Sequence, residues 1–234
     1  MYIVTGVSRG LGKAVVEKLL LRSESVIGIG RSHSFDHPNF SFLECDFSSP
    51  DKIENLEFPQ LKGAVTLINN AGIIGNIKRI SDQNTPDLEH VMAVNVISPM
   101  QLTQLIYGKT ESKDDFTLVN ISSGAANRAI PSWASYCASK AALNMLTETF
   151  YLEELEKDNH PKVYAVAPGV IDTDMQVQIR LTEKADFSSL ENFKELKESN
   201  SLFSASEASN RLLALIDKPF TGQIQQDLRT IEIV

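Results

Sequence analysis

The sequence predicts an α/β fold in one domain: a doubly wound, mostly parallel sheet of about seven strands with helices on both faces. Three observations carry this prediction. Short apolar runs alternate along the chain with longer stretches of helical periodicity. Small or polar residues follow nearly every apolar run, as expected where parallel strands end at a ligand-binding edge. A glycine-rich segment also joins the first apolar run to the first helical pattern.

The apolar runs place the strands, and the 3.6-residue patterns between them place the helices. Helices are expected after the first strand and at 86–107, 134–156 and 205–216. Residues 175–203 are less regular and richer in charge, so we expect a substrate lid there within a single domain spanning 1–234. The expected strands are 2–4, 25–29, 40–45, 64–68, 116–121, 163–166 and 224–228.

Composition excludes several functional classes. The 234 residues carry a net charge of −8, which argues against a nucleic-acid partner because such proteins present a basic stripe. No apolar stretch approaches the length of a membrane span or a signal peptide, and the histidines show no metal-ligand spacing. The two cysteines form no CxxC motif, which fits a reducing compartment. We therefore expect a cytoplasmic protein without a metal or a membrane partner.

The glycine-rich segment TGVSRGLG, residues 5–12, lies between the first strand and the first helix. Gly6 permits a tight turn, Gly10 lets the backbone approach a pyrophosphate, and Gly12 allows close packing of helix and strand. The free N–H groups and positive dipole of the helix N-terminus favour an anion. This strand–loop–helix context is that of a Rossmann-type dinucleotide-binding fingerprint.

Further motifs follow the later strands. They are NNAG at 69–72, Asn95, Ser123, YCASK at 136–140, and Pro168-Gly169 with Thr173. With the TGxxxGxG loop, this order resembles the short-chain dehydrogenase/reductase family over nearly the whole chain. The stretches NISSGA, SWASYCASKAALNM and APGVIDTDMQVQIR are most similar to the sepiapterin and benzil reductase subgroup. The resemblance implies NADPH-dependent reduction of a carbonyl to an alcohol, the substrate being a ketone or diketone of aromatic or pterin-like character.

Tyr136 and Lys140 are the expected catalytic pair. They are four residues apart at the start of a helix, so their side chains share a face. A nearby ammonium favours the phenolate, which would lower the pKa of Tyr136 from its usual value of about 10. Ser123 would hydrogen-bond the substrate oxygen. Ser122 is a rival for that role by position alone, and the family spacing favours Ser123.

Asn95 lies on an otherwise apolar helix stripe, where a buried amide needs partners. Pro99, four residues later, has no N–H for the Asn95 carbonyl and tends to kink the helix. In the family this asparagine anchors a water that leads to the lysine. We therefore expect Pro99 to help to expose the Asn95 carbonyl for a proton relay.

Two arginines predict NADP(H) as the cofactor. Arg31 follows Gly30 where NAD-binding proteins place an acidic residue, and Arg9 stands in the glycine-rich loop. A guanidinium pairs well with a 2′-phosphate. Asp46 matches the family position that contacts the adenine, although a helix-capping role explains it nearly as well.

The resemblance also implies the remaining site residues. For the substrate they are Ser123 and Tyr136. Trp133 and Met175 are added because they flank the active-site segments and could line an apolar pocket, with core packing an equal alternative for Trp133. A homodimer or homotetramer is expected. An NAD-dependent alcohol dehydrogenase working in the oxidising direction and a non-catalytic dinucleotide sensor remain alternatives. The full expected set for the cofactor is Gly6, Ser8, Arg9, Gly10, Leu11, Gly12, Arg31, Asp46, Asn70, Ala71, Gly72, Tyr136, Lys140, Pro168, Gly169, Ile171 and Thr173.

Overall fold

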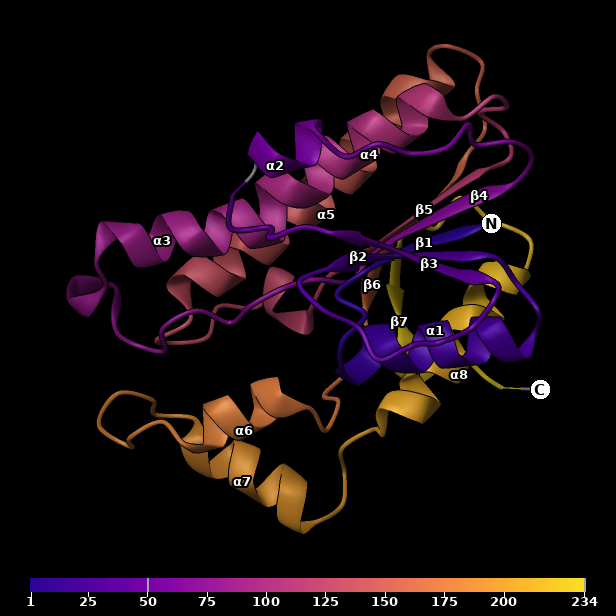
Figure 1. The fold of residues 1–234 in the computed structure, drawn as a ribbon. Coiled ribbons are helices and arrows are strands. Elements are labelled where there is room, and N and C mark those ends of the chain that lie inside the picture. The colour runs from indigo at the N-terminus through magenta and orange to yellow at the C-terminus, as the bar shows by residue number, and fades with distance from the viewer. Residues whose placement is uncertain (50, 234) are drawn as a thin grey trace.

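In the computed structural model, which describes residues 1–49 and 51–233, seven strands form one sheet (Figure 1). The strand order is β3-β2-β1-β4-β5-β6-β7, and every neighbouring pair is parallel. The order reverses between β1 and β4, so a crevice opens there at the carboxyl ends. The predicted doubly wound fold is therefore confirmed. The strands are β1 (Tyr2–Thr5), β2 (Val26–Gly30), β3 (Phe40–Glu44), β4 (Val65–Asn69), β5 (Phe116–Ile121), β6 (Lys162–Ala167) and β7 (Gln225–Asp227).

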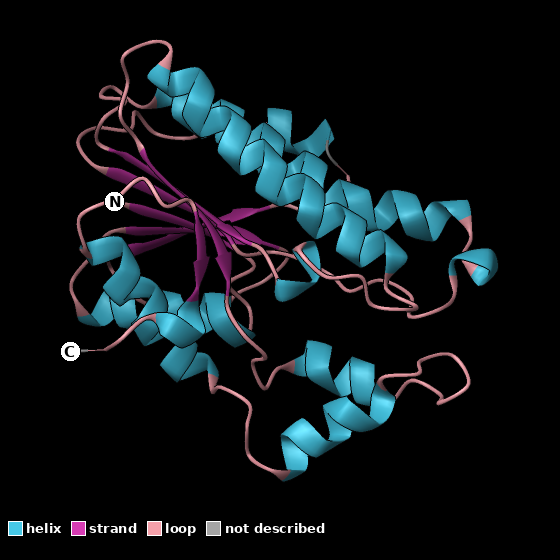
Figure 2. Ribbon diagram, turned by 180° about the vertical axis from the view of Figure 1, so that it is seen from behind, coloured by secondary structure: helices cyan, strands magenta, loops and turns pink. Residues whose placement is uncertain are grey.

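Helices cover both faces of the sheet, as Figures 1 and 2 show. On one face α1 (Gly10–Leu21) packs against α8 (Ala205–Asp217). On the other lie α2 (Asp51–Glu54), α3 (Thr85–Met92), α4 (Ser98–Lys109) and α5 (Ala134–Leu155). Adjacent residues of β1 enter the two cores separately: Val4 packs towards α1 and α8, and Ile3 towards α4. Both faces of a parallel strand are buried, which explains its unbroken apolar run.

The helix expected at 86–107 is divided by a π-helical turn. It comprises α3, the π turn Ala93–Ile97 and α4. The N–H of Ser98 donates to the carbonyl of Ala93, five residues earlier. Pro99 follows directly and cannot supply the N–H that a regular helix would donate to Asn95. The sequence indicated an irregularity at this place, and the structure shows its form.

The segment expected as a lid contains two helices, α6 (Asp174–Arg180) and α7 (Leu190–Glu198). They lie apart from the main layers in Figures 1 and 2. A single parallel bridge between Ile171 and Phe203 closes the base of the excursion. Across the described part of the chain, no helix is both long and apolar enough to cross a membrane.

Candidate active site

A cavity of about 970 Å³ runs along the carboxyl ends of the strands. Its lining extends from the glycine-rich loop to the first turns of α5 and to α6. It includes every predicted cofactor, substrate and catalytic residue except Gly12 and Asn95, which lie behind its wall. Segments that are far apart in the sequence thus meet in one site, as the strand ends predicted. Its size is near the upper end of the roughly 300–1,000 Å³ typical of ligand pockets.

The glycine-rich loop is shaped by contacts that leave no room for side chains. Gly6 has a φ of +70°, and a Cβ there would lie 3.0 Å from the Cα of Ala71. Gly12 faces the Gly6 carbonyl, which a Cβ would approach to 2.3 Å. The Thr5 hydroxyl accepts hydrogen bonds from the N–H groups of Asn70 and Ala71, each 2.9 Å long. The loop is therefore fixed against the NNAG segment.

This cradle fits a dinucleotide. The α1 helix begins at Gly10, and its N-cap residue, Arg9, provides no side-chain cap for the first-turn N–H groups. Uncapped N–H groups at a helix N-terminus favour a phosphate. At Gly10, φ is +58° and a Cβ would lie 3.2 Å from the Thr173 methyl group, so only glycine keeps the groove open. The loop backbone around Gly10 would hold the pyrophosphate.

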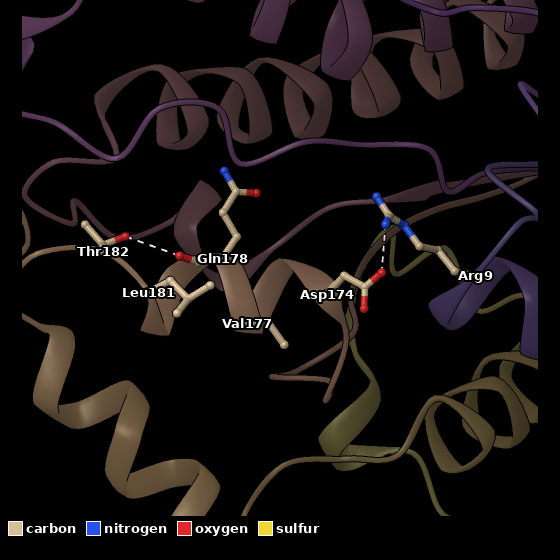
Figure 3. A pocket seen from close by; sticks show the side chains of 6 residues that line it. All are labelled: Arg9, Asp174, Val177, Gln178, Leu181 and Thr182. Carbon is tan, nitrogen blue, oxygen red and sulfur yellow. Dashed lines mark hydrogen bonds and ion pairs between the residues drawn. The ribbon is translucent and has the colours of Figure 1, made fainter.

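The two arginines expected at a 2′-phosphate occupy different positions. Arg31 follows β2 and lines the cavity near Asp46, whose pKa is lowered mainly by hydrogen bonds from Ser48 and further by the Arg31 charge. Both the N–H and the hydroxyl of Ser48 donate to Asp46, so this carboxylate also stabilises a turn. Arg9 instead forms a 2.7 Å ion pair with Asp174 at the edge of a shallow depression on α6 (Figure 3).

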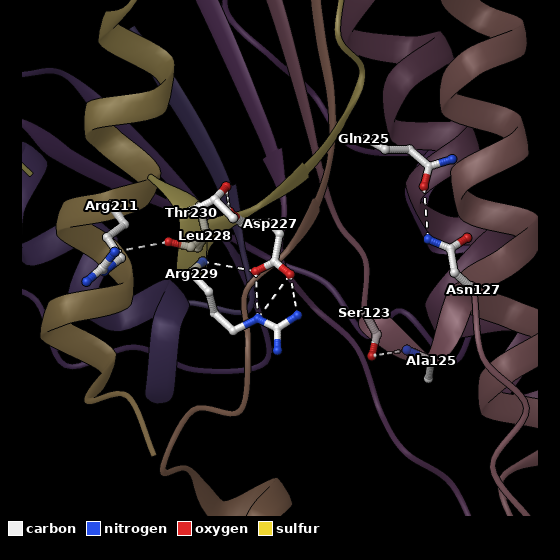
Figure 4. A network of polar contacts seen from close by, with 9 residues as sticks. All are labelled: Ser123, Ala125, Asn127, Arg211, Gln225, Asp227, Leu228, Arg229 and Thr230. Atoms are coloured by element: carbon white, nitrogen blue, oxygen red, sulfur yellow. Dashed lines mark hydrogen bonds and ion pairs between the residues drawn. The ribbon is translucent and has the colours of Figure 1, made fainter. Parts of the chain in front are cut away.

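Ser123, Tyr136 and Lys140 meet at the inner end of the cavity. The Ser123 hydroxyl caps a short turn by accepting from the Ala125 N–H at 3.1 Å (Figure 4). It is also close enough to the Tyr136 phenol to lower its pKa. The rival Ser122 is buried and its hydroxyl donates to Asn144. The structure therefore places Ser123, and not Ser122, beside the tyrosine.

Burial is the main influence on the pKa values of Tyr136 and Lys140, the expected catalytic pair. Tyr136 is 7% exposed, and desolvation raises the pKa of its phenol while the nearby Ser123 hydroxyl lowers it. Desolvation also lowers the pKa of Lys140 to about 8. The Lys140 ammonium donates to the Ile121 carbonyl at 2.8 Å and lies 5.9 Å from the centre of the Tyr136 ring. The expectation that Lys140 lowers the pKa of Tyr136 is therefore wrong for this structure, because burial raises that pKa and the lowering influence comes from Ser123.

Asn95 is fully buried and its side chain is an internal brace. Its amide nitrogen donates to the Ile73 carbonyl at 2.8 Å and to the Ser139 hydroxyl at 3.0 Å, and its amide oxygen accepts from the Ile73 N–H at 2.9 Å. A Cβ on Gly72 would lie 3.3 Å from that oxygen and 3.4 Å from the Lys140 nitrogen. The side chains of Asn95 and Lys140 therefore both lie beside Gly72, and Asn95 does not line the cavity.

The part of the cavity beside Tyr136 is aromatic. Trp133 stacks on Phe187 at 5.4 Å and meets the Tyr136 ring edge-on at 5.6 Å between centroids. Trp133 is therefore both core and cavity wall. The predicted Met175 also lines the cavity.

Several cavity residues were missed by sequence reasoning. Gln176 and Phe193 come from the irregular excursion, Asp227 from the end of β7 and Arg229 from the 3₁₀ turn that follows it. The Arg229 guanidinium forms an ion pair with Asp227, and its Nε lies 2.9 and 3.0 Å from the two carboxylate oxygens (Figure 4). The sequence assigned no role to these positions, because only the return of distant segments to the sheet edge makes them neighbours.

Comparison with known proteins agrees with this geometry. The family described as short chain dehydrogenase matches residues 1–184. A benzil reductase of Bacillus subtilis is 34% identical over 93% of each chain, and a sepiapterin reductase of Mus musculus is 28% identical over 92% of this chain and 91% of that one. A short chain dehydrogenase/reductase structure from Saccharomyces cerevisiae superposes with a TM-score of 0.83 at 28% identity, covering 97% and 95% of the chains. The resemblance to the benzil and sepiapterin reductase subgroup is confirmed, and the chain belongs to the short-chain dehydrogenases, oxidoreductases that use a nicotinamide dinucleotide.

Proposed function

We propose that the enzyme reduces a ketone or diketone to an alcohol with NADPH. The observation that carries this proposal is the position of the buried Tyr136 beside the half-buried Ser123, in a cavity that starts in the glycine-rich loop. The names of the relatives support it, since they include benzil reductases, sepiapterin reductases and an NADPH-dependent pterin aldehyde reductase of Arabidopsis thaliana. Aromatic or pterin-like carbonyls are accordingly the first substrates to test.

The protonation of Tyr136 is compatible with the reducing direction. Its raised pKa keeps the proton on the phenol oxygen at neutral pH, where it is available to a carbonyl oxygen. Ser123 would hydrogen-bond the same oxygen and stabilise the charge that develops there. When bound, NADPH supplies a hydride from C4 of its nicotinamide. A proton-loaded acid suits reduction better than oxidation of an alcohol.

Lys140 and Asn95 would act behind the tyrosine. The Lys140 ammonium stabilises the phenolate that remains after the proton has left. Asn95, fixed between Ile73 and Ser139, orients the backbone at the π turn, where its carbonyl would anchor a proton relay. The position of Asn95 across Gly72 from the lysine supports this role.

NADPH is proposed over NADH because of charge. Arg31 lines the cavity, and Gly30 stands where an acidic residue would repel a 2′-phosphate. Arg9 lies in the same cavity and becomes a second partner once it leaves Asp174. Thr173 and the Ile171 backbone are proposed to receive the nicotinamide carboxamide.

We also propose a cytoplasmic homodimer or homotetramer in which residues 175–203 close over the substrate. Exposed apolar side chains on α4 and α5 support self-association; they are Met100, Met145 and Leu152. Light scattering coupled to size-exclusion chromatography measures the mass in solution. A monomer at micromolar concentration would contradict this assignment.

Optical measurement of NADPH oxidation against a panel of diketones, quinones and pterin carbonyls tests the function. Turnover of at least one class with NADPH, and much weaker turnover with NADH, is the expected result. Binding of NADPH without turnover of any carbonyl would favour a dinucleotide sensor instead. Faster oxidation of the matching alcohols with NAD would favour a dehydrogenase.

A further inference from the structure

Gln176 carries a buried hydrogen-bonding group that the fold leaves unused. It lies on α6, lines the cavity and is only 7% exposed. Its amide oxygen is buried and, among the described residues, accepts no hydrogen bond. Buried polar atoms in folded proteins almost always have a partner, so an orphan in a cavity wall points to a ligand.

The position of Gln176 around the axis of α6 indicates whether it adjoins the cofactor part or the substrate part of the cavity. Successive residues of a helix are about 100° apart, so Gln176 lies about 200° around α6 from Asp174. Asp174 faces the glycine-rich loop through its ion pair with Arg9. Ile179, which is on the same inner side as Gln176, packs into the apolar cluster that contains Trp133. Gln176 therefore lies on the side of α6 away from the phosphate loop.

An aromatic wall adjoins this position. Phe193, from α7, lines the cavity and its ring centre lies 5.2 Å from that of Trp133. Trp133 in turn meets Tyr136 edge-on. A flat carbonyl compound that places its oxygen at Tyr136 would lie along these rings. Its far edge would then reach towards α6.

No neighbouring side chain among the described residues supplies a hydrogen bond to the Gln176 amide oxygen. Arg180 is one turn further along the same face of α6, and its Nη1 is also buried without a partner among the described residues. The Arg180 guanidinium instead approaches Asp172, at 3.8 Å. The two orphan groups do not hydrogen-bond each other, so Arg180 does not account for the amide of Gln176.

Resting on the proposed carbonyl reductase function, we propose that Gln176 is a specificity-determining residue whose amide oxygen accepts a hydrogen bond from the substrate. The substrate class is then a flat, conjugated carbonyl compound that also carries an N–H or O–H donor. A plain diketone offers only acceptors and leaves the oxygen unpaired. A site built to accept a hydrogen bond disfavours an analogue that lacks the donor.

Isatin and N-methylisatin test the proposal, because they share the reacting ketone and differ in one N–H. The ratio of kcat/KM for isatin to that for N-methylisatin is measured in four proteins: the wild type, Gln176→Leu, Gln176→Glu and Val177→Leu. The NADPH Kd and the melting temperature are measured for each. Val177 is the matched control, as a partly exposed neighbour on α6.

We expect the ratio to fall about ten-fold in Gln176→Leu, the usual effect of one lost hydrogen bond. It should be retained in Gln176→Glu, which keeps an acceptor, and in Val177→Leu. An unchanged ratio in Gln176→Leu overturns the assignment, whether or not the melting temperature falls. Equal losses for both substrates with weaker NADPH binding overturn it in favour of a cofactor contact. If the wild type reduces neither compound nor any other carbonyl, the proposed function itself fails.

Discussion

Arg9 Nη1 lies 2.7 Å from Asp174 Oδ2, in an ion pair that joins the glycine-rich loop to the first residue of α6 (Figure 3). The sequence had assigned Arg9 to the 2′-phosphate of the cofactor. In the structure the same guanidinium is held by a carboxylate of the excursion. Both side chains are largely exposed, 70% and 65%, so the pair is weak and a phosphate would compete well for Arg9.

Asp174→Asn should therefore tighten NADPH binding. An exposed pair contributes about 0.2–1 kcal/mol, so its loss corresponds to a Kd up to about five-fold lower. NADH has no 2′-phosphate, and its Kd should not change. Titration of NADPH fluorescence measures both values. Asp158→Asn makes the same charge change at a fully exposed site and serves as the control. Equal tightening of both cofactors would mean that Arg9 does not contact the 2′-phosphate.

Arg31→Asp should reverse the cofactor preference. An acidic side chain after β2 repels the 2′-phosphate and can accept hydrogen bonds from a free ribose hydroxyl. We expect NADPH binding to weaken at least about ten-fold while NADH binding holds or improves. Arg79→Asp, at an exposed loop position, controls for the change in net charge. An unaltered ratio of the two dissociation constants would argue against the NADP(H) assignment.

Tyr136→Phe should remove turnover and leave cofactor binding intact. Loss of a positioned acid lowers rates by about a hundred- to ten-thousand-fold. Single-turnover NADPH oxidation measures the rate, and fluorescence titration measures the binding. Tyr151 is also in α5, and its ring packs against Phe220. The control variant Tyr151→Phe should therefore retain activity. Substantial turnover in Tyr136→Phe would require another proton donor.

The rate of reduction should fall as the pH rises through about 8. Burial lowers the pKa of Lys140 to about 8, so its ammonium is present below that pH and is lost above it. Burial raises the pKa of Tyr136, and its phenol therefore stays protonated over the same range. The profile of kcat/KM against pH, with the NADPH Kd measured at each point, should show one descending limb. A rate that is flat to pH 10 would contradict this role of Lys140.

Pro99→Ala tests the π turn. The new N–H at position 99 can donate to the Asn95 carbonyl, which would favour a regular helix and block the proposed relay. We expect kcat to fall several-fold while the NADPH Kd stays the same. Pro86→Ala is the matched control, because Pro86 stands in the first turn of α3, where an N–H has no helical partner. If kcat does not change in Pro99→Ala, the proline does not serve the relay.

Local chemistry in the sequence was enough to predict the sheet and half of the site. A strand that is buried on both faces requires apolar residues, and a position where a side chain would clash requires glycine. Both requirements can be read from the residue types. That is why the strands, the Gly6–Gly12 loop and the Tyr136–Lys140 spacing were all predictable. The break at Pro99 was also visible, because proline lacks an N–H in any context.

The tertiary structure alone decided the rest. The burial of Ser122 against Asn144 and the raised pKa of the Tyr136 phenol both arise only when the cavity has assembled. Asp174, paired with Arg9, and the orphan amide of Gln176 depend on where α6 returns to the sheet edge. Sequence patterns record what each residue does for its own element. Desolvation and contacts between distant elements exist only after the chain has packed.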